Sequence, residues 1–258
     1  MQRNLTMLTE VVQQRFKRNI LLPEVGEEGQ ARLLDAKVLV VGAGGLGSPV
    51  AMYLAASGIG TLGIADGDVV DISNLQRQLL HHTADIGKEK VKSAKAKLTS
   101  IRPEIHVEQY ECRLDEDGLK RVVGLYDFVI DATDTITAKL QINDVCIAMQ
   151  KPFSHGGIYR FCGEAMTVVP PNGACYRCAY SPGLSANPTS TAPPAGPLGP
   201  VAGIIGCIQA TECIKYLLGM KDLLVNTLMV IDARGMEFRK VRIRRDPRCG
   251  ACGEERRG

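Results

Sequence analysis

The chain has 258 residues, of which 45% are apolar and 23% are charged, with 31 Lys and Arg residues against 28 Asp and Glu residues. This amount of apolar side chain supports a sizeable core and excludes a chain that is disordered throughout. A formal net charge of +3 also excludes a nucleic-acid binder held mainly by bulk electrostatics, so we expect no nucleic-acid partner.

The first ten residues contain no apolar stretch that follows basic residues, so we expect neither a secretory signal nor a membrane anchor. Residues 38–65 carry no charge and are long enough to span a bilayer, but their repeated glycines make them a poor continuous helix. They fit a buried strand, a tight turn, a helix and a second buried strand. We therefore expect a cytoplasmic protein with no membrane partner.

After a helical N-terminal arm, strand and helix patterns alternate along the first part of the chain. Strands are predicted at 38–41, 61–65, 106–111 and 128–131, and helices at 46–57, 88–101, 115–125 and 136–150. This alternation indicates an α/β fold with a Rossmann-like, mostly parallel sheet and helices on both faces.

Beyond residue 150 the pattern changes. Strands are predicted at 153–157, 164–169, 227–232 and 237–244, and an apolar helix at 203–218. Six prolines between residues 182 and 200 predict a long loop before that helix, because neither a helix nor a central strand tolerates such a density of proline. The last strand is rich in Arg and Lys, which fits either a solvated strand face or a patch for an acidic partner.

Nine cysteines make an odd count, and without an export signal we do not expect a disulfide framework. Cys175 and Cys178 form one C-x-x-C pair, and Cys249 and Cys252 form another, each among turn-forming residues. Two such turns can converge on a tetrahedral, structural zinc ion, although either pair alone could be a redox dithiol. The other five cysteines are predicted to be small buried apolar residues: Cys112, Cys146, Cys162, Cys207 and Cys213.

A glycine-rich segment follows the first predicted strand and opens the next helix. Gly42, Gly44, Gly45 and Gly47 lie in this segment, and Asp66 ends the second strand, where a carboxylate can accept hydrogen bonds from a ribose. Taken alone, these features predict a dinucleotide enzyme such as an NAD-dependent oxidoreductase. Glycine packing without any nucleotide is the alternative.

Further charged residues fit a triphosphate with Mg²⁺ better than a nicotinamide. Asp68, Asn74, Arg77 and Lys90 follow Asp66 along the chain. Asp131 and Asp134 stand at the end of a later strand. Carboxyl ends of parallel strands converge on one crevice, where Mg²⁺ prefers carboxylates and phosphate oxygens, and Arg and Lys stabilise phosphate charge. Each residue taken singly also fits a surface ion pair.

Several motifs occur in one order along the chain. The glycine segment is followed by Asp66-x-Asp68 and then by Ser73-Asn74-Leu75-Gln76-Arg77-Gln78. Together with Arg15-Phe16-Lys17-Arg18 and the final cysteine pair, this order resembles the ubiquitin-activating-like adenylyltransferases of the MoeB/ThiF/HesA family over nearly the whole chain. The resemblance implies a single adenylation domain over residues 1–258, with a helical arm (1–35), a nucleotide-binding core (36–170) and a C-terminal part holding a crossover loop, the zinc site and strands (171–258).

The resemblance also implies an activity. ATP activates the C-terminal glycine carboxylate of a ubiquitin-like sulfur-carrier protein as an acyl adenylate and releases pyrophosphate. The resemblance implies that the nucleotide loop is formed by Gly42, Gly44, Gly45 and Gly47. Asp66 and Asp68 would bind the nucleotide, with Asp66 on the ribose. The phosphates would be contacted by Asn74, Arg77 and Lys90, and Mg²⁺ would be bound by Asp134. Arg18 would reach the triphosphate of a neighbouring subunit in a homodimer, and the four cysteines would bind structural zinc.

The sequence departs from that family at three positions. Ala192 stands where some relatives carry a loop cysteine, so we expect adenylation without a covalent link there. Thr135 replaces the usual Asn after Asp134, and Asn19 replaces the usual Gln after Arg18. A non-catalytic scaffold that keeps the fold is a further alternative. Molybdopterin, thiamine, cysteine and siderophore-type pathways all remain open for the carrier.

Overall fold

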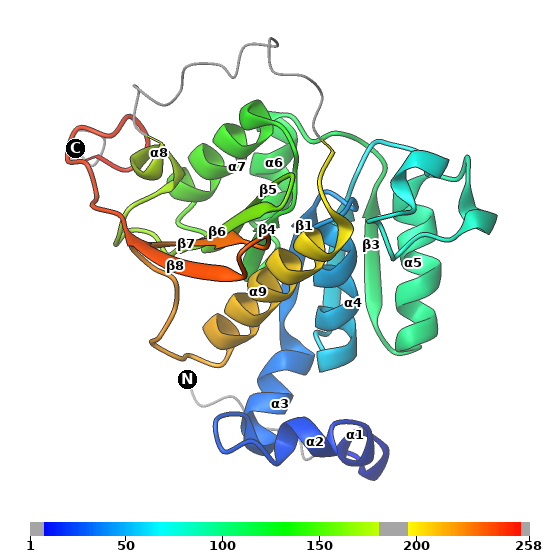
Figure 1. The fold of residues 1–258 in the computed structure, drawn as a ribbon. Coiled ribbons are helices and arrows are strands. Elements are labelled where there is room, and N and C mark those ends of the chain that lie inside the picture. The colour runs from blue at the N-terminus through cyan, green and yellow to red at the C-terminus, as the bar shows by residue number, and fades with distance from the viewer. Residues whose placement is uncertain (1–7, 181–195, 254–258) are drawn as a thin grey trace.

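The computed structural model describes residues 8–180 and 196–253, which form one eight-stranded sheet in the order β3-β2-β1-β4-β5-β6-β7-β8 (Figure 1). Its first five members run parallel: β1 (Lys37–Val41), β2 (Thr61–Ala65), β3 (His106–Tyr110), β4 (Phe128–Asp131) and β5 (Phe153–Tyr159). Antiparallel strands then extend the sheet: β6 (Cys162–Val168), β7 (Thr227–Asp232) and β8 (Glu237–Arg242). The predicted mostly parallel sheet with C-terminal strands is confirmed.

Helices cover both faces of this sheet. One face, called here the α9 face, carries α3 (Gly26–Asp35), α4 (Gly47–Ser57), α5 (Lys90–Ile101) and α9 (Gly199–Leu217). The other, called the α7 face, carries α6 (Glu116–Val123), α7 (Ile136–Ala148) and the short α8 (Tyr176–Ala179). Two 3₁₀ turns, Ile72–Asn74 and Thr83–Asp85, lie between β2 and α5.

The central strands are apolar on both faces because helices cover both. Every residue of β4 is buried, and Phe128 and Ile130 pack in the core of the α9 face while Val129 packs in the core of the α7 face. β1 shows the same pattern from Val38 to Val41. Such continuous apolar runs are typical of parallel strands, and they explain why these strands could be predicted closely from sequence.

The N-terminal arm packs at the amino ends of the strands. It contains α1 (Glu10–Arg15), α2 (Lys17–Ile20) and α3, and Figure 1 shows α1 and α2 below the sheet. Arg15 Nη1 donates to the carbonyl of Ile101 at 3.1 Å, at the end of α5. The ring of buried Phe16 lies beside Gly58, at the end of α4. The arm therefore lies at the opposite end of α4 from the glycine segment.

Two predictions from sequence are wrong. The helix predicted from residue 203 begins at Gly199 and includes Pro200, because proline is tolerated in the first helical turn, where its missing N–H has no partner to lose. Cys112 and Cys162 are exposed rather than buried, since Cys112 follows the edge strand β3 and Cys162 begins β6 beside a hairpin turn, and Cys207 on α9 is only partly buried. Among the described residues, no helix combines the length and apolar character needed to cross a membrane.

Two glycines should respond oppositely to a methyl group. A Cβ on Gly60, in the turn before β2, would lie 1.9 Å from the carbonyl oxygen of Leu34, whereas a Cβ on Gly203 in α9 would have no atom within 4 Å. We expect Gly60→Ala to lower the free energy of unfolding by about 1–3 kcal/mol through backbone displacement. Gly203→Ala should raise it by about 0.5–1 kcal/mol, because alanine loses less backbone entropy in a helix.

Urea unfolding followed by circular dichroism measures both free energies. Equal destabilisation by the two substitutions would contradict the different packing of the two glycines.

Candidate functional site

The glycine segment forms a tight turn between β1 and α4. Gly42 has φ +101°, and a Cβ there would lie 2.6 Å from the carbonyl oxygen of Ala132, while a Cβ on Gly47 would lie 1.9 Å from the carbonyl oxygen of Gly42. The protein's own packing therefore requires glycine at these two positions. Around Gly44 and Gly45 the nearest atoms would be 3.4–3.5 Å away, an ordinary contact. Packing leaves these two glycines unexplained, which favours a close approach by a ligand.

Asp66, at the end of β2, holds this turn through backbone amides. Its Oδ2 accepts a hydrogen bond from the Ala43 N–H at 2.8 Å, and its Oδ1 accepts one from the Asp68 N–H at 2.8 Å. The glycine turn, the end of β2 and the residues that follow β2 are thus tied together. The order β3-β2-β1-β4 reverses direction at β1, which places the turn where nucleotides bind in open α/β sheets.

Asp68 joins two cations beside this turn. Its carboxylate accepts from Lys90 Nζ at 3.1 Å and from Arg113 Nη2 at 2.8 Å. Lys90 begins α5 and is 6% exposed. The hydrogen bond from Arg113 is the largest influence on the carboxyl of Asp68 and, with Lys90, holds its pKa below the usual value. Asp68 is therefore ionised at neutral pH and compensates the buried ammonium of Lys90.

Arg77 lies next to the glycine turn, and Asn74 ends the 3₁₀ turn just before it in the chain. Arg77 packs its side chain against Gly45 and donates from Nη1 to the carbonyl of Ser73 at 3.0 Å. Asn74 accepts from the Asp71 N–H at 3.3 Å, within the capping box of the first 3₁₀ turn. The first 3₁₀ turn therefore positions the Arg77 guanidinium at the rim of the turn.

Asp134 lies on the turn between β4 and α7, and its side chain is exposed. This turn contacts the glycine turn, because a Cβ on Gly42 would lie 3.3 Å from the Thr133 nitrogen. The pKa of Arg113 is raised, chiefly by its hydrogen bond to Asp68 and further by the charges of Asp134 and Asp66. The structure thus brings Asp66, Asp68, Arg77, Lys90 and Asp134 around the glycine turn, and Asn74 lies in the 3₁₀ turn that precedes Arg77.

Two contributors to this site, Arg113 and His81, gave no signal in sequence. Arg113 has no motif and becomes visible only through its bond to Asp68. His81 is buried and bridges the Ala43 carbonyl, at 2.9 Å, and the Ser93 hydroxyl, at 2.9 Å, so it ties the glycine turn to α5. Burial is the main cause that lowers the pKa of His81.

Asp131, which sequence grouped with Asp134, is 1% exposed and points into the α7 face instead of the crevice.

Arg18 does not join the site of its own chain. It is exposed on α2, in the arm at the amino ends of the strands, and α4 with its 11 residues spans about 16 Å between the two locations. Thr135 caps α7 by accepting from the Ala138 N–H at 3.2 Å, a role that asparagine also performs. Asn19 donates to Gln30 within the arm at 3.3 Å. Ala192 lies outside the described residues.

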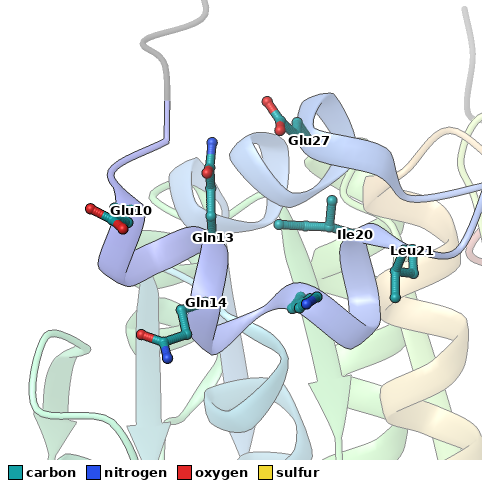
Figure 2. Close-up of a pocket in the computed structure, with 7 residues that line it drawn as sticks. Glu10, Gln13, Gln14, Ile20, Leu21 and Glu27 are labelled. Atoms are coloured by element: carbon teal, nitrogen blue, oxygen red, sulfur yellow. The ribbon is translucent and has the colours of Figure 1, made fainter.

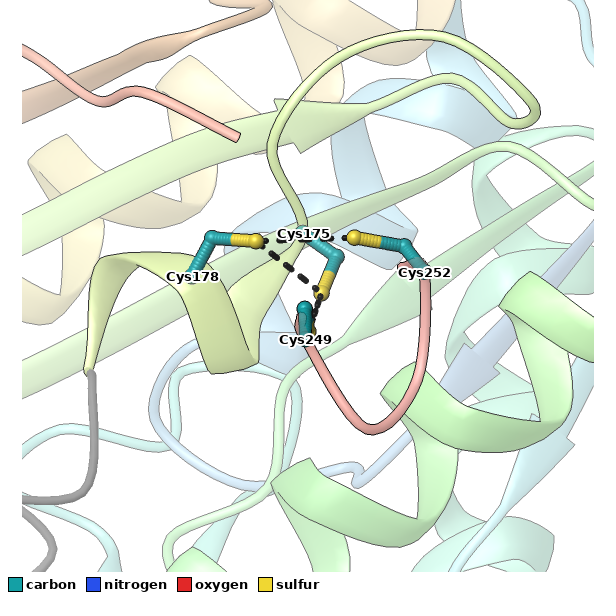
Figure 3. Close-up of side chains that lie close together, drawn as sticks. All are labelled: Cys175, Cys178, Cys249 and Cys252. Atoms are coloured by element: carbon teal, nitrogen blue, oxygen red, sulfur yellow. Dashed lines mark hydrogen bonds between the residues drawn. The ribbon is translucent and has the colours of Figure 1, made fainter. Parts of the chain in front are cut away.

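The four paired cysteines converge at one point, as Figure 3 shows. Sulfur–sulfur distances are 3.9 Å for Cys175–Cys178, 3.6 Å for Cys175–Cys249 and 3.5 Å for Cys178–Cys252. Four Zn–S bonds of about 2.3 Å in a tetrahedron place sulfurs about 3.8 Å apart, so the cluster fits zinc. The hydrogen bond from the Cys175 thiol is the main cause that lowers the pKa of Cys178, which favours the thiolate, the form that binds metal.

A model described as the ThiF family matches residues 16–251, which is most of the chain. The chain belongs to the ThiF family. It is 44% identical over 240 residues to the SAMP-activating enzyme E1 of Haloferax volcanii, with 93% of this chain and 88% of that protein covered. It is 39% identical to the sulfur carrier protein adenylyltransferase of Thermus thermophilus, with 93% and 91% covered.

A solved ThiF-like structure supports the same assignment. The crystal structure of E. coli MccB with ATP has a TM-score of 0.82 and 26% identity, and covers 93% of this chain and 74% of that one. The resemblance inferred from sequence is confirmed. These relatives give no support to the NAD-dependent oxidoreductase that the glycine segment and Asp66 alone allowed.

The four-cysteine cluster should contain stoichiometric zinc. We expect elemental analysis of purified protein to find about one zinc per chain, and Cys249→Ser to lose it.

Loss of the cross-link between α8 and the C-terminal turn should remove about 3 kcal/mol of stability, which lowers Tm by about 6–12 °C in a chain of this size. Cys162→Ser is the control, since Cys162 is exposed outside the cluster and should leave both zinc and Tm unchanged. Zinc-free protein, or zinc retained in Cys249→Ser, would contradict the assignment.

Proposed function

We propose that this chain is an ATP-dependent adenylyltransferase that activates the C-terminal glycine carboxylate of a ubiquitin-like sulfur-carrier protein as an acyl adenylate. The observation that carries the proposal is the gathering of Arg77, Lys90, Asp66 and Asp134 around the glycine turn in a ThiF family member. Relatives named as a SAMP-activating enzyme and a sulfur carrier protein adenylyltransferase support this substrate class. Acyl adenylation would use all of these groups together, the cations at the phosphates and the carboxylates at the ribose and Mg²⁺.

In this reaction the carrier's carboxylate attacks the α-phosphorus of ATP, a P–O bond forms, and the bond to pyrophosphate breaks. No protein nucleophile is needed, so the protein must orient the two substrates and stabilise the growing phosphate charge. The Gly44 and Gly45 backbone and the amino terminus of α4 would hold phosphate oxygens. Asp66 would hold the ribose, and Asp68 would support the site by keeping Lys90 in place.

Cations complete the proposed phosphate site. Arg77, Asn74 and Lys90 would contact the phosphates, and Asp134 would bind Mg²⁺, which supplies charge neutralisation at the phosphate oxygens. Lys90 is held by a carboxylate that it shares with Arg113, so it can turn towards a phosphate while Arg113 keeps Asp68 compensated. We propose a cytoplasmic location, which fits the free cysteines among the described residues.

Arg77 offers a direct test of this function. We expect Arg77→Ala to lower carrier-dependent ATP–pyrophosphate exchange by about 100- to 1,000-fold, because a phosphate cation would be missing in the transition state. Arg121→Ala removes an exposed arginine from α6 and serves as the matched control, with exchange close to that of the unmodified protein. Circular dichroism checks that both variants keep the fold. Near-normal exchange in Arg77→Ala, or exchange that needs no carrier, would refute the proposal.

We further propose that the protein works as a homodimer in which Arg18 reaches the triphosphate of the neighbouring subunit. The support is that Arg18 lies in the arm at the far end of the strands from its own glycine turn. The arm also exposes Val11, Leu21 and Leu22. A cavity of ≈ 390 Å³ lies in the arm. Figure 2 shows Gln13, Gln14, Ile20, Leu21 and Glu27 among the side chains that line it. These unpartnered surfaces suit contact with a second copy.

Complementation between two inactive variants tests this arrangement. We expect Arg18→Ala and Asp134→Ala each to be inactive alone. When the two are co-expressed with different tags, one site of each mixed dimer combines an intact Asp134 with the partner's intact Arg18. A statistical mixture should then recover about one quarter of normal exchange activity, because half of the dimers are mixed and half of their sites are intact. No recovery in purified mixed dimers would exclude an arginine supplied by the neighbouring subunit.

A further inference from the structure

A second cluster of charged residues lies in the interior of the α7 face. Asp131 ends β4, and its register partner on β5 is His155, which is fully buried. His155 Nδ1 donates to Asp131 Oδ2 at 2.9 Å, and Lys139 Nζ from α7 lies 3.3 Å from the same oxygen. Burial alone would raise the pKa of Asp131, but the charge of Lys139 and the hydrogen bond from His155 lower it. Asp131 is therefore a buried carboxylate of β4 that is held by β5 and α7.

The cluster contacts the turn that carries Asp134. Asp131 Oδ1 accepts from the Thr133 hydroxyl at 2.7 Å and from the Thr133 N–H at 3.1 Å. Thr133 precedes Asp134, and the same turn lies against Gly42. The orientation of the Asp131 carboxylate thus fixes the backbone immediately before the proposed Mg²⁺ ligand.

The cluster also contacts the four-cysteine site. The His155 ring packs on the ring of Tyr176 with centroids 4.6 Å apart, and Tyr176 packs on Tyr180 at 4.6 Å. Tyr176 follows the metal-site residue Cys175 directly, and its N–H donates to Asn143 of α7 at 2.9 Å. Metal binding that orders α8 would therefore also order the surface against which the His155 ring rests.

The Nε2 side of the His155 ring faces Glu164, which Gly157 leaves room to approach. Glu164 of β6 lies on the same face with its Oε1 3.5 Å from His155 Nε2, and that nitrogen makes no hydrogen bond among the described residues. A Cβ on Gly157 would lie 2.9 Å from the Glu164 carboxylate, so glycine allows Glu164 to turn towards the ring. His155 is consequently in contact with groups from β4, β6 and α8.

We propose that His155 is a positioning residue that couples the four-cysteine site to the nucleotide site, with its ring resting on Tyr176 and its Nδ1 holding Asp131 and, through it, the Asp134 turn. The inference rests on the proposed function only in taking Mg²⁺·ATP as the ligand of that turn. It assigns His155 no contact with substrate. Its consequence is that loss of zinc weakens nucleotide binding at a site to which the cysteines contribute no atom.

Two substitutions separate the two contacts of His155. His155→Phe keeps a ring against Tyr176 but removes the donor to Asp131, and His155→Asn keeps a donor but removes the ring. Calorimetry of Mg²⁺·ATP binding to zinc-loaded protein should show about tenfold or greater weakening in His155→Phe, the size typical of residues that support metal ligands, and a smaller change in His155→Asn. Chelation of zinc should weaken binding in the unmodified protein, but cause little further change in either variant.

Thr167→Val is the matched control. Thr167 is also fully buried, and its hydroxyl bonds to Glu212 on the opposite face at 2.6 Å, so the variant loses a buried hydrogen bond without touching the cluster. It should lower Tm but leave both Mg²⁺·ATP affinity and its response to chelation unchanged. If the unmodified protein binds no Mg²⁺·ATP, the proposed function fails. If it binds and His155→Phe binds equally well, the role of His155 fails while the function stands.

A measurement on the unmodified protein covers the case in which His155→Phe does not fold. Hydrogen exchange of the Thr133 amide, which donates to Asp131, should become faster when zinc is chelated. Exchange of the Ala43 amide, which is held by Asp66 from β2, serves as the internal reference and should not change. Unchanged protection of Thr133 after complete zinc removal would overturn the coupling.

Discussion

The contact between the glycine turn and the β4–α7 turn sets the geometry of the candidate site. The Ala132 N–H donates to the Val41 carbonyl at 2.9 Å, and the Ala132 carbonyl oxygen lies 2.6 Å from where a Cβ of Gly42 would be. Any side chain at residue 42 would push the two turns apart. Because α4 begins just after one turn and Asp134 belongs to the other, this backbone contact fixes a helix amino terminus relative to a carboxylate. The cations at the rim can act together only if that spacing is kept.

Charge around this contact is arranged in two layers. Asp66 accepts only backbone amides among its described hydrogen bonds, so it holds the turn, whereas Asp68 accepts only side-chain cations and so holds Lys90. A buried ammonium needs a compensating charge, and a fully buried partner would bind it too firmly to release it. The Asp68 side chain is 43% exposed and shared with Arg113, which keeps Lys90 available to an anion.

Sequence predicted the central strands β1, β2 and β4 because they are short apolar runs that end at or just before glycine or aspartate, as in Phe128–Asp131. It also paired the cysteines, since C-x-x-C spacing is a local signal. It failed where the outcome depends on register between distant segments. Nothing near Asp131 in the chain indicates that the residue faces His155 instead of the crevice, and nothing near Arg113 indicates its bond to Asp68. The high density of prolines predicted a loop that includes Pro200, but Pro200 lies in the first turn of α9, where proline is favourable.

The separation of Arg18 from the glycine turn bears on how such an enzyme would be controlled. One chain brings Arg77, Lys90 and the carboxylate proposed to bind Mg²⁺, Asp134, to the carboxyl ends of the strands, but carries the candidate cation Arg18 at the amino ends. Under the proposed role of Arg18, a triphosphate in an isolated chain would lack one stabilising charge, and a second chain would supply it. Under the proposed function, the cost of a missing cation falls on the transition state. Assembly of two chains would then determine the rate of adenylation, although all four cysteines of the proposed zinc site come from one chain.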